Sequence, residues 1–308
     1  MNKKVAILLV LYNEEKHIER LARSIINQSY KEISVYAFDN NSKDSSVSLL
    51  QKHLPKANII HSGENLGFAK GNNYIAAEAI RNNEDLLFIL NTDMELESNC
   101  VKNLVDIISE RDDIVGVGPI VYVGTEEGRT KNVQCYGDLS NFTNGRTKTL
   151  YKGAGLSIDE LPDTLYVNSL HGGSFIIRST IISKIGLFNE DNFMYGDEID
   201  LAYRISKIKG KLIVTKNAQS WHYHNWSPEN KTGSYLQYYY INRNRFLFFH
   251  RYAKRLSFIP QIFVELLFFP VKIKWAKRTA GIKLLKYYYL GYWHGILNKK
   301  GKANFEFK

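Results

Sequence analysis

Residues 5–11 read Val-Ala-Ile-Leu-Leu-Val-Leu, a continuous apolar run of strand length near the start of the chain. A secretory signal would need a small-residue cleavage site after this run, whereas Tyr12-Asn13-Glu14-Glu15 follows it. A short run that is apolar at every position is typical of a strand buried on both faces of a sheet. We therefore expect a buried strand over residues 5–12.

Strands and helices alternate through the first 123 residues. Over 15–28, the apolar residues Ile18, Leu21 and Ile25 fall on one face of a helix. Further strands are expected at 33–38, 58–61, 86–90 and 114–123, and further helices from Ser42 to about 54, at 72–81 and at 98–108. This order predicts an α/β fold with a mostly parallel sheet and helices on both faces.

The later part of the chain is less regular. Residues 124–163 lose periodicity, and we interpret them as an excursion over the active face that can include a small hairpin. Beyond it we expect strands at 166–177 and 211–215, and helices at 179–185, 197–208 and 234–251.

The composition excludes several classes of protein. The chain has 308 residues, of which 44% are hydrophobic and 23% charged, as in ordinary globular proteins. Cys100 and Cys135 are the two cysteines, too few for a disulfide scaffold or a four-cysteine zinc site. We interpret them as reduced thiols in a cytosolic protein.

The net charge of +10 comes from the end of the chain. Residues 241–308 hold 15 basic residues and two acids, whereas the rest holds 26 basic and 29 acidic residues. The apolar run 258–271 is too short to span a bilayer, and Pro260, Glu265 and Pro270 interrupt it. Apolar and basic residues together favour an amphipathic helical extension over 251–308 that binds an anionic membrane through 251–300, rather than nucleic acid. Core helices packed on the main domain are the alternative.

Glycine-rich phosphate-binding loops are absent from the sequence. No glycine follows the first strand as in a dinucleotide-binding fingerprint, and no Walker A motif occurs. Ligands of such sheets bind beyond the carboxyl ends of the strands, where Asp39 and Asp93 lie. Asp39 suits a ribose hydroxyl or a base N–H, and Asp93 suits a divalent ion with substrate phosphates. Each acid can equally be a turn residue.

Three further groups of residues have both a functional and a structural interpretation. The cluster Asp197-Glu198-Ile199-Asp200 opens a helix, where acids act as a general base or only complement the helix dipole. His222 and His224 suit a metal, a diphosphate or aromatic packing. Arg243 and Arg245 can contact a phosphate or face solvent.

Nine stretches, in this order, resemble the family 2 glycosyltransferases of GT-A fold, and most of all their bacterial rhamnosyltransferase-like branch. They are VAILLVLYN (5–13), SIINQSY (24–30), FDNNSKDS (38–45), NLGFAKGN (65–72), LNTD (90–93), GGSFIIR (172–178), IGLFNE (185–190), FMYGDEIDL (193–201) and YYINRNR (239–245). The resemblance implies a domain over 1–250, with a nucleotide-binding half (1–123) and an acceptor and catalytic half (124–250).

The resemblance further implies an inverting sugar transfer from a nucleoside diphosphate donor to a hydroxyl of a glycan or lipid-linked acceptor in cell-surface polysaccharide synthesis. Rhamnose from dTDP-rhamnose is the expected sugar, with a UDP-hexose or a non-catalytic binding protein as alternatives. The protein would act in the cytoplasm, at the inner face of the plasma membrane.

The resemblance also assigns roles to residues. Glu198 matches the base, with Asp197 as the alternative because the family's Glu-Asp order is exchanged. Asp93 and His222 would hold Mg²⁺ or Mn²⁺, although Asn91 replaces the first acid of the D-x-D motif. The donor-binding residues would be Tyr12, Asn13, Glu14, Asp39, Asn65, Gly67, Lys70, Asn91 and Asp93. Those on the sugar and acceptor side would be Gly172, Gly173, Asp200 and Arg243.

Overall fold

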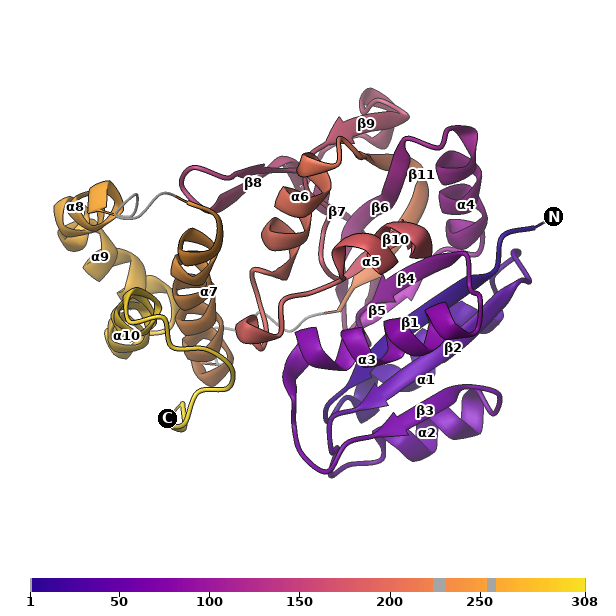
Figure 1. Cartoon of the computed structure of the whole chain (residues 1–308), viewed down its shortest axis with the longest axis horizontal. Coiled ribbons are helices and arrows are strands. Elements are labelled where there is room, and N and C mark those ends of the chain that lie inside the picture. Colours follow the sequence, from indigo (N-terminus) through magenta and orange to yellow (C-terminus); the bar gives the residue numbers. More distant parts are fainter. Residues whose placement is uncertain (1, 224–230, 254–258, 308) are drawn as a thin grey trace.

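The structure is a computed structural model that describes residues 2–223, 231–253 and 259–307. Figure 1 shows a twisted sheet with helices on both faces, and a group of helices from the end of the chain at one side. The strands are β1 (Val5–Leu11), β2 (Ile33–Asp39), β3 (Asn58–His61), β4 (Leu86–Leu90), β5 (Met94–Leu96), β6 (Ile114–Thr125), β7 (Gly128–Asn141), β8 (Arg146–Gly153), β9 (Thr164–Val167), β10 (Ser174–Arg178) and β11 (Lys211–His222).

The α-helices are α1 (Glu15–Ile26), α2 (Ser46–His53), α3 (Gly67–Arg81), α4 (Cys100–Glu110), α5 (Ser179–Ile185), α6 (Asp197–Lys207), α7 (Lys231–Tyr252), α8 (Ile259–Leu267), α9 (Phe269–Thr279) and α10 (Lys283–Ile296). Short 3₁₀ turns occur at Ile158–Glu160 and Glu190–Asn192. Most helices and strands expected from the sequence are confirmed, including the buried first strand.

The sheet is parallel in its first half and mixed in its second. Its order is β3-β2-β1-β4-β10-β6-β11-β5, and the pairs among β3, β2, β1 and β4 are all parallel. Leu11 pairs with Asp39, so the ends of β1 and β2 lie side by side. β10 then runs antiparallel between β4 and β6. The predicted mostly parallel sheet is therefore corrected to a mixed sheet.

The two faces of the sheet bury separate cores. Along β1, Ala6 and Leu8 face a cluster that includes Ile75 of α3, whereas Ile7 and Leu9 face a cluster that includes residues of α1 and α4. A continuous apolar strand is what two covered faces require, since successive side chains point to opposite sides. This arrangement explains why β1 carries no polar residue.

Three expectations for the second half of the chain need correction. The excursion after residue 123 contains a long hairpin, because β7 pairs with β6 on one side and with β8 on the other. The predicted strand 166–177 is two strands, since β9 pairs with β11 and β10 pairs with β4 and β6. β11 continues to His222 through an irregularity between Thr215 and Gln219.

The C-terminal helices are packed against α7. Aromatic side chains of α7 and α10, among them Tyr239 and Tyr287, share buried clusters with residues of α9. A Cβ at Gly291 of α10 would lie 2.3 Å from the carbonyl oxygen of Tyr239, so only glycine permits this close approach. The expected boundary at residue 250 falls inside α7, and the extension thus shares a core with that helix. Within this extension, α10 is the helix whose aromatic side chains are buried against α7.

Candidate active site

One cavity of about 480 Å³ lies at the carboxyl ends of the first strands. Its walls come from loops after β1, β2 and β4, from the segment before β10, and from the start of α6. Of the residues predicted from sequence, it is lined by Tyr12, Glu14, Asn65, Gly67, Asn91, Asp93, Gly172, Gly173, Asp197, Glu198 and His222. The topology thus brings together residues that are more than 200 positions apart.

The loops after β1 and β2 are held by hydrogen bonds between neighbouring segments. The buried Asp39 accepts a hydrogen bond from the Ser42 backbone N–H, three residues on, at 2.9 Å, and its other oxygen lies 3.3 Å from His61 Nδ1. Asn13 adopts a positive φ of 57°, and its side chain accepts from the Lys43 N–H at 2.8 Å. Asp39, Asn13 and Lys70 are not among the described lining residues of the cavity.

Asp93 and His222 face each other at the cavity wall. His222 Nε2 lies 3.1 Å from Asp93 Oδ2, and His222 Nδ1 lies 2.9 Å from the side-chain nitrogen of Gln134. Asn91 is fixed by its N–H, which donates to the Gly173 carbonyl at 2.9 Å. Its buried Oδ1 atom has no hydrogen-bond partner among the described residues.

These groups fit a divalent ion. Mg²⁺ prefers oxygen ligands and commonly takes one or two carboxylates together with substrate phosphates. Asp93 supplies a carboxylate, and the unsatisfied Asn91 Oδ1 is a second oxygen. In the described part of the chain, no three His, Cys, Asp or Glu side chains form a protein cage. The site therefore suits an ion that shares its ligands with a bound diphosphate. His224 lies outside the described residues.

Asp197 and Glu198 begin α6 and line the same cavity. Asp197 is 1% exposed, and its Oδ1 accepts a hydrogen bond from Asn192 Nδ2 at 3.0 Å. Its Oδ2 is buried and has no partner among the described residues. Burial, and then the charge of Glu198, raise the pKa of Asp197. Burial also raises the pKa of Glu198.

Gly172 makes room for the Glu198 carboxyl group. A Cβ at position 172 would lie 1.8 Å from Glu198 Oε1. Any side chain there would push the carboxyl group out of its place, so the glycine is required by the position of Glu198.

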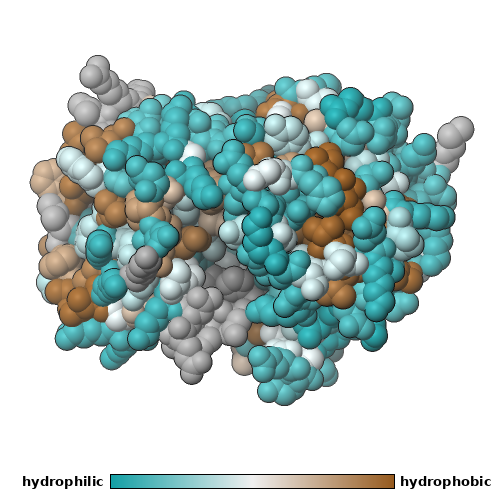
Figure 2. Space-filling view, turned by 90° about the horizontal axis from the view of Figure 1, so that it is seen from below, coloured by the Kyte–Doolittle hydropathy of each residue, from teal (hydrophilic) through white to brown (hydrophobic). Residues whose placement is uncertain are grey.

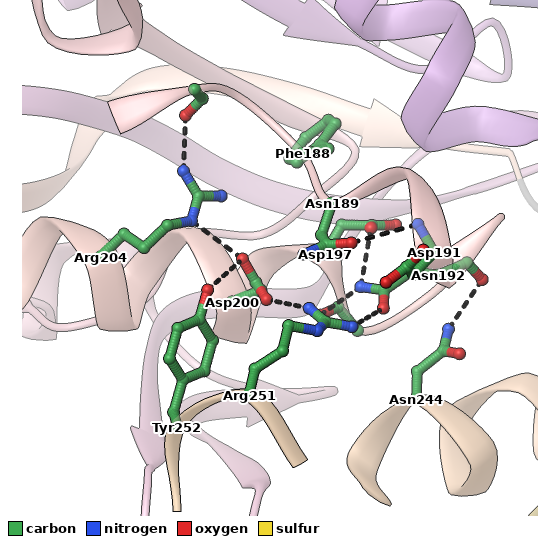
Figure 3. Close-up of polar contacts among 12 residues, drawn as sticks. Phe188, Asn189, Asp191, Asn192, Asp197, Asp200, Arg204, Asn244, Arg251 and Tyr252 are labelled. Atoms are coloured by element: carbon green, nitrogen blue, oxygen red, sulfur yellow. Dashed lines mark hydrogen bonds and ion pairs between the residues drawn. The ribbon is translucent and has the colours of Figure 1, made fainter. Parts of the chain in front are cut away.

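Asp200 and Arg243 do not line the cavity, which corrects the sequence-based expectation. Asp200 accepts from Arg204 Nε at 2.9 Å, and it is also paired with Arg251 and with the hydroxyl of Tyr252 (Figure 3). Arg243 is 1% exposed and donates to the carbonyl of Asn192 at 2.7 Å. Arg204 and Arg251 pair with the Asp200 carboxylate, and the Arg243 guanidinium donates to backbone carbonyls, so both side chains hold neighbouring segments together.

Several residues that line the cavity were not predicted from the sequence, namely Asn40, Gln134, Asp138, Thr147, His171 and Tyr195. Gln134, Asp138 and Thr147 belong to the β7–β8 hairpin, whose sequence has no helical periodicity and no recognised motif. His171 directly precedes Gly172-Gly173, a proximity that would have pointed to it. Burial, and then the proximity of His222, lower the pKa of His171 to about 4, so this imidazole is neutral.

Comparison with known proteins identifies the family. The sequence pattern of glycosyl transferase family 2 matches residues 6–165, which is more than half of the chain. The chain belongs to glycosyl transferase family 2.

Two relatives of this glycosyltransferase cover most of both chains. The N-acetylglucosaminyl-diphospho-decaprenol L-rhamnosyltransferase of Mycobacterium tuberculosis is 22% identical over 77% of this chain and 81% of its own. A hexosyltransferase of low-salt glycan biosynthesis from Haloferax volcanii is 25% identical over 97% of this chain and 92% of its own.

The solved structures agree in fold. A mannosyltransferase from Pyrobaculum calidifontis, solved with GDP-Man and Mn²⁺, matches with a TM-score of 0.57 and 14% identity. The match covers 84% of this chain and 68% of that protein. The GT-A fold class is confirmed, and the family shows that the protein is a glycosyltransferase.

Proposed function

We propose that this glycosyltransferase transfers a sugar, rhamnose in the first place, with inversion at the anomeric carbon, and that Glu198 is its base. The observation that carries the proposal is the single cavity of about 480 Å³ that Asp93 and His222 share with Asp197 and Glu198. Asp93 and His222 would lie beside the diphosphate, and Glu198 would be the proton acceptor in the same cavity.

The chemistry is a single displacement. The acceptor hydroxyl oxygen forms a bond to the anomeric carbon while the bond from that carbon to the diphosphate oxygen breaks. The electron pair of the breaking bond stays on the diphosphate, and Glu198 takes the hydroxyl proton. Glu198 fits this role better than Asp197, because Asp197 is almost fully buried and hydrogen bonded to Asn192. The transition state has oxocarbenium character, as in other reactions at this carbon.

Asp93, Asn91 and His222 are the residues that would hold Mg²⁺ or Mn²⁺. When bound, such an ion neutralises negative charge that develops on the departing diphosphate. Tyr12, Glu14, Asn65 and Gly67 would surround the nucleotide, and Gln134 would orient the His222 ring through Nδ1. Asp39 would act from behind the wall, where it shapes the loop after β2.

The names of the relatives support two donors. The mycobacterial relative is named an L-rhamnosyltransferase and the archaeal one a hexosyltransferase. We therefore propose dTDP-rhamnose as the donor and a UDP-hexose as the alternative.

We also propose that the protein binds an anionic membrane surface at its C-terminal helices. Exposed apolar side chains gather there, in α8, at the α8–α9 junction and in α9: Ile259, Phe263, Leu267, Phe268, Phe269 and Val271. Figure 2 shows hydrophobic residues at this end of the molecule, among hydrophilic ones. Apolar side chains beside lysines are typical of helices that lie in a membrane interface. No helix in the described ranges has the length and apolar character of a membrane span.

A panel of nucleotide sugars tests the proposed function. The protein would be incubated with Mn²⁺, with dTDP-rhamnose, UDP-glucose or GDP-mannose, and with a prenyl-diphospho-N-acetylglucosamine acceptor. We expect acceptor-dependent release of dTDP, and a product of inverted configuration by NMR. A retained configuration, or equal release without acceptor, would contradict the proposal. Release of UDP would select the alternative donor.

A further inference from the structure

A second cavity, of about 740 Å³, adjoins the first at the proposed base. Thr147, Tyr195 and Glu198 line both cavities. From there the second cavity runs between α7 and the α8–α9 region, where Val271 and Trp275 contribute to its wall. Because the two cavities meet at Glu198, a molecule in the second one can present a hydroxyl to that carboxyl group.

Basic groups gather at one wall of the second cavity. Arg146, Arg245 and Lys272 line it, and all three lie near the carboxylate of Glu265. Arg146 donates to Glu265 at 2.9 Å and brings the β7–β8 hairpin against α8. Its own side chain is still 55% exposed. Three basic groups around one acid leave this wall positively charged, as an anionic ligand requires.

The remaining wall of this cavity is apolar and leads to the surface. Phe268 and Val271 line the cavity and also belong to the exposed apolar set of α8 and α9. Trp275 and Ile241 continue the apolar wall inward. A ligand in this cavity thus meets the base at one end, positive charge along its side, and an apolar exit at the other end.

We propose that the second cavity binds the sugar acceptor, and that this acceptor is a phosphate-bearing lipid whose apolar chain leaves over Phe268 and Val271. The inference rests on the proposed function, because Glu198 must be the base for the junction to matter. The acceptor's sugar hydroxyl lies at Glu198, its phosphate lies at Arg146 and Lys272, and its chain continues into the surface that binds the membrane. The bonds that form and break are those given above for the transfer.

Farnesyl diphosphate is a suitable probe, because it joins an apolar chain to a diphosphate and has no sugar. Its binding to the full-length protein would be followed by tryptophan fluorescence, since Trp275 lines the cavity. Saturating dTDP with Mg²⁺ would be present to occupy the donor cavity. Farnesol and inorganic diphosphate are the two partial probes, and each is expected to bind at least tenfold more weakly than farnesyl diphosphate.

Two matched substitutions test the location. Val271 lines the cavity and is 60% exposed, whereas Ile282, at the start of α10, is 58% exposed and lies outside the described lining. Val271→Asp should weaken farnesyl diphosphate binding at least tenfold, and Ile282→Asp should change it less than twofold. Arg146→Gln should weaken farnesyl diphosphate severalfold and leave farnesol unchanged. Unchanged thermal unfolding and dTDP affinity would show that each variant is folded.

Three results would overturn the inference. They are equal effects of Val271→Asp and Ile282→Asp, farnesyl diphosphate binding that is seen only when dTDP is left out, and absence of farnesyl diphosphate binding, with or without dTDP, in a protein that does bind dTDP. The last result leaves the proposed function intact. Failure of the proposed function has a different signature, namely a retained configuration or equal nucleotide release without acceptor, whatever the probe does.

Discussion

The loops after β1 and β2 and the corner before α6 are built in different ways. Asp39 bonds to Ser42 and Asn13 bonds to Lys43, so the first region is held by hydrogen bonds among adjacent strand-end loops. The second region depends on a distant helix, because Asn244 of α7 donates to the carbonyls of Met194 at 2.8 Å and of Asn192 at 3.0 Å. The end of the cavity proposed for the nucleotide is therefore organised by the first half of the sheet, and the corner that carries the proposed base is organised by α7.

The largest expected effect follows from Glu198→Gln. Loss of a general base typically lowers the rate by about 10²–10⁴-fold. Nucleotide affinity should stay within about twofold, because the donor wall is built separately, and the comparison between the regions predicts this separation. Acceptor-dependent dTDP release and dTDP titration measure the two quantities. Near-normal turnover in this variant would show that another residue is the base.

Asp93→Ala should act at the donor wall. We expect nucleotide diphosphate affinity in Mn²⁺ to fall about tenfold or more, since a carboxylate ligand of the ion is lost. Calorimetric titration of dTDP with and without Mn²⁺ measures this change. The matched variant Asp39→Asn should weaken binding to the same extent in both conditions. If Asp93→Ala also weakens metal-free binding equally, Asp93 contacts the nucleotide itself.

Asn244→Ala tests whether α7 holds the catalytic corner. The change removes three hydrogen bonds to the carbonyls of Asn192, Met194 and Tyr195, and should lower the free energy of unfolding by about 1–3 kcal/mol. We expect kcat to fall about tenfold with unchanged dTDP affinity. Asn242→Ala is a control for stability and not for turnover, because Asn242 is buried on the same helix and, among the described residues, donates to the Tyr238 carbonyl of that helix, but it also lines the second cavity. Equal destabilisation by the two variants would contradict this role of α7.

The smallest effect concerns the pH dependence of stability. The pKa of Asp197 is raised by burial, so the folded state holds its proton more tightly than the unfolded state does. The contribution of Asp197 to the free energy of unfolding is therefore largest at low pH, and it is lost as the pH rises towards the raised pKa. Asp197→Asn removes this loss, because the amide carries no ionisable proton. Its gain in melting temperature should therefore be larger at pH 8 than at pH 5, and equal gains would exclude the effect.

The fall of the transfer rate at low pH provides a related test. A base must be deprotonated, and burial raises the pKa of Glu198 above that of an ordinary glutamate. Transfer should therefore begin to fall, on acidification, at a higher pH than an exposed glutamate would give. Transfer rates measured between pH 4 and pH 8 give the pH at which this fall begins.

The sequence revealed much of the site because strand ends are local features. Asp93 follows a fully apolar strand, and parallel strands end at one edge of a sheet, so proximity to the end of β1 follows from the pattern. Asp200 was expected at the cavity but does not line it. An acid at the start of a helix fits a binding site and a structural ion pair equally well. Only the fold shows that Arg204 and Arg251 satisfy it.

The apolar runs and their alternation with helices determined by themselves that this chain is an α/β protein, because a strand buried on both faces is apolar at every position and the covering helices show helical periodicity. The order of its motifs likewise indicated the family. Tertiary structure alone decided that β10 enters the sheet antiparallel and that Arg243 supports a loop. It also decided that a second cavity opens beside Glu198. Each of these depends on contacts between segments far apart in the chain, and no local pattern encodes such contacts.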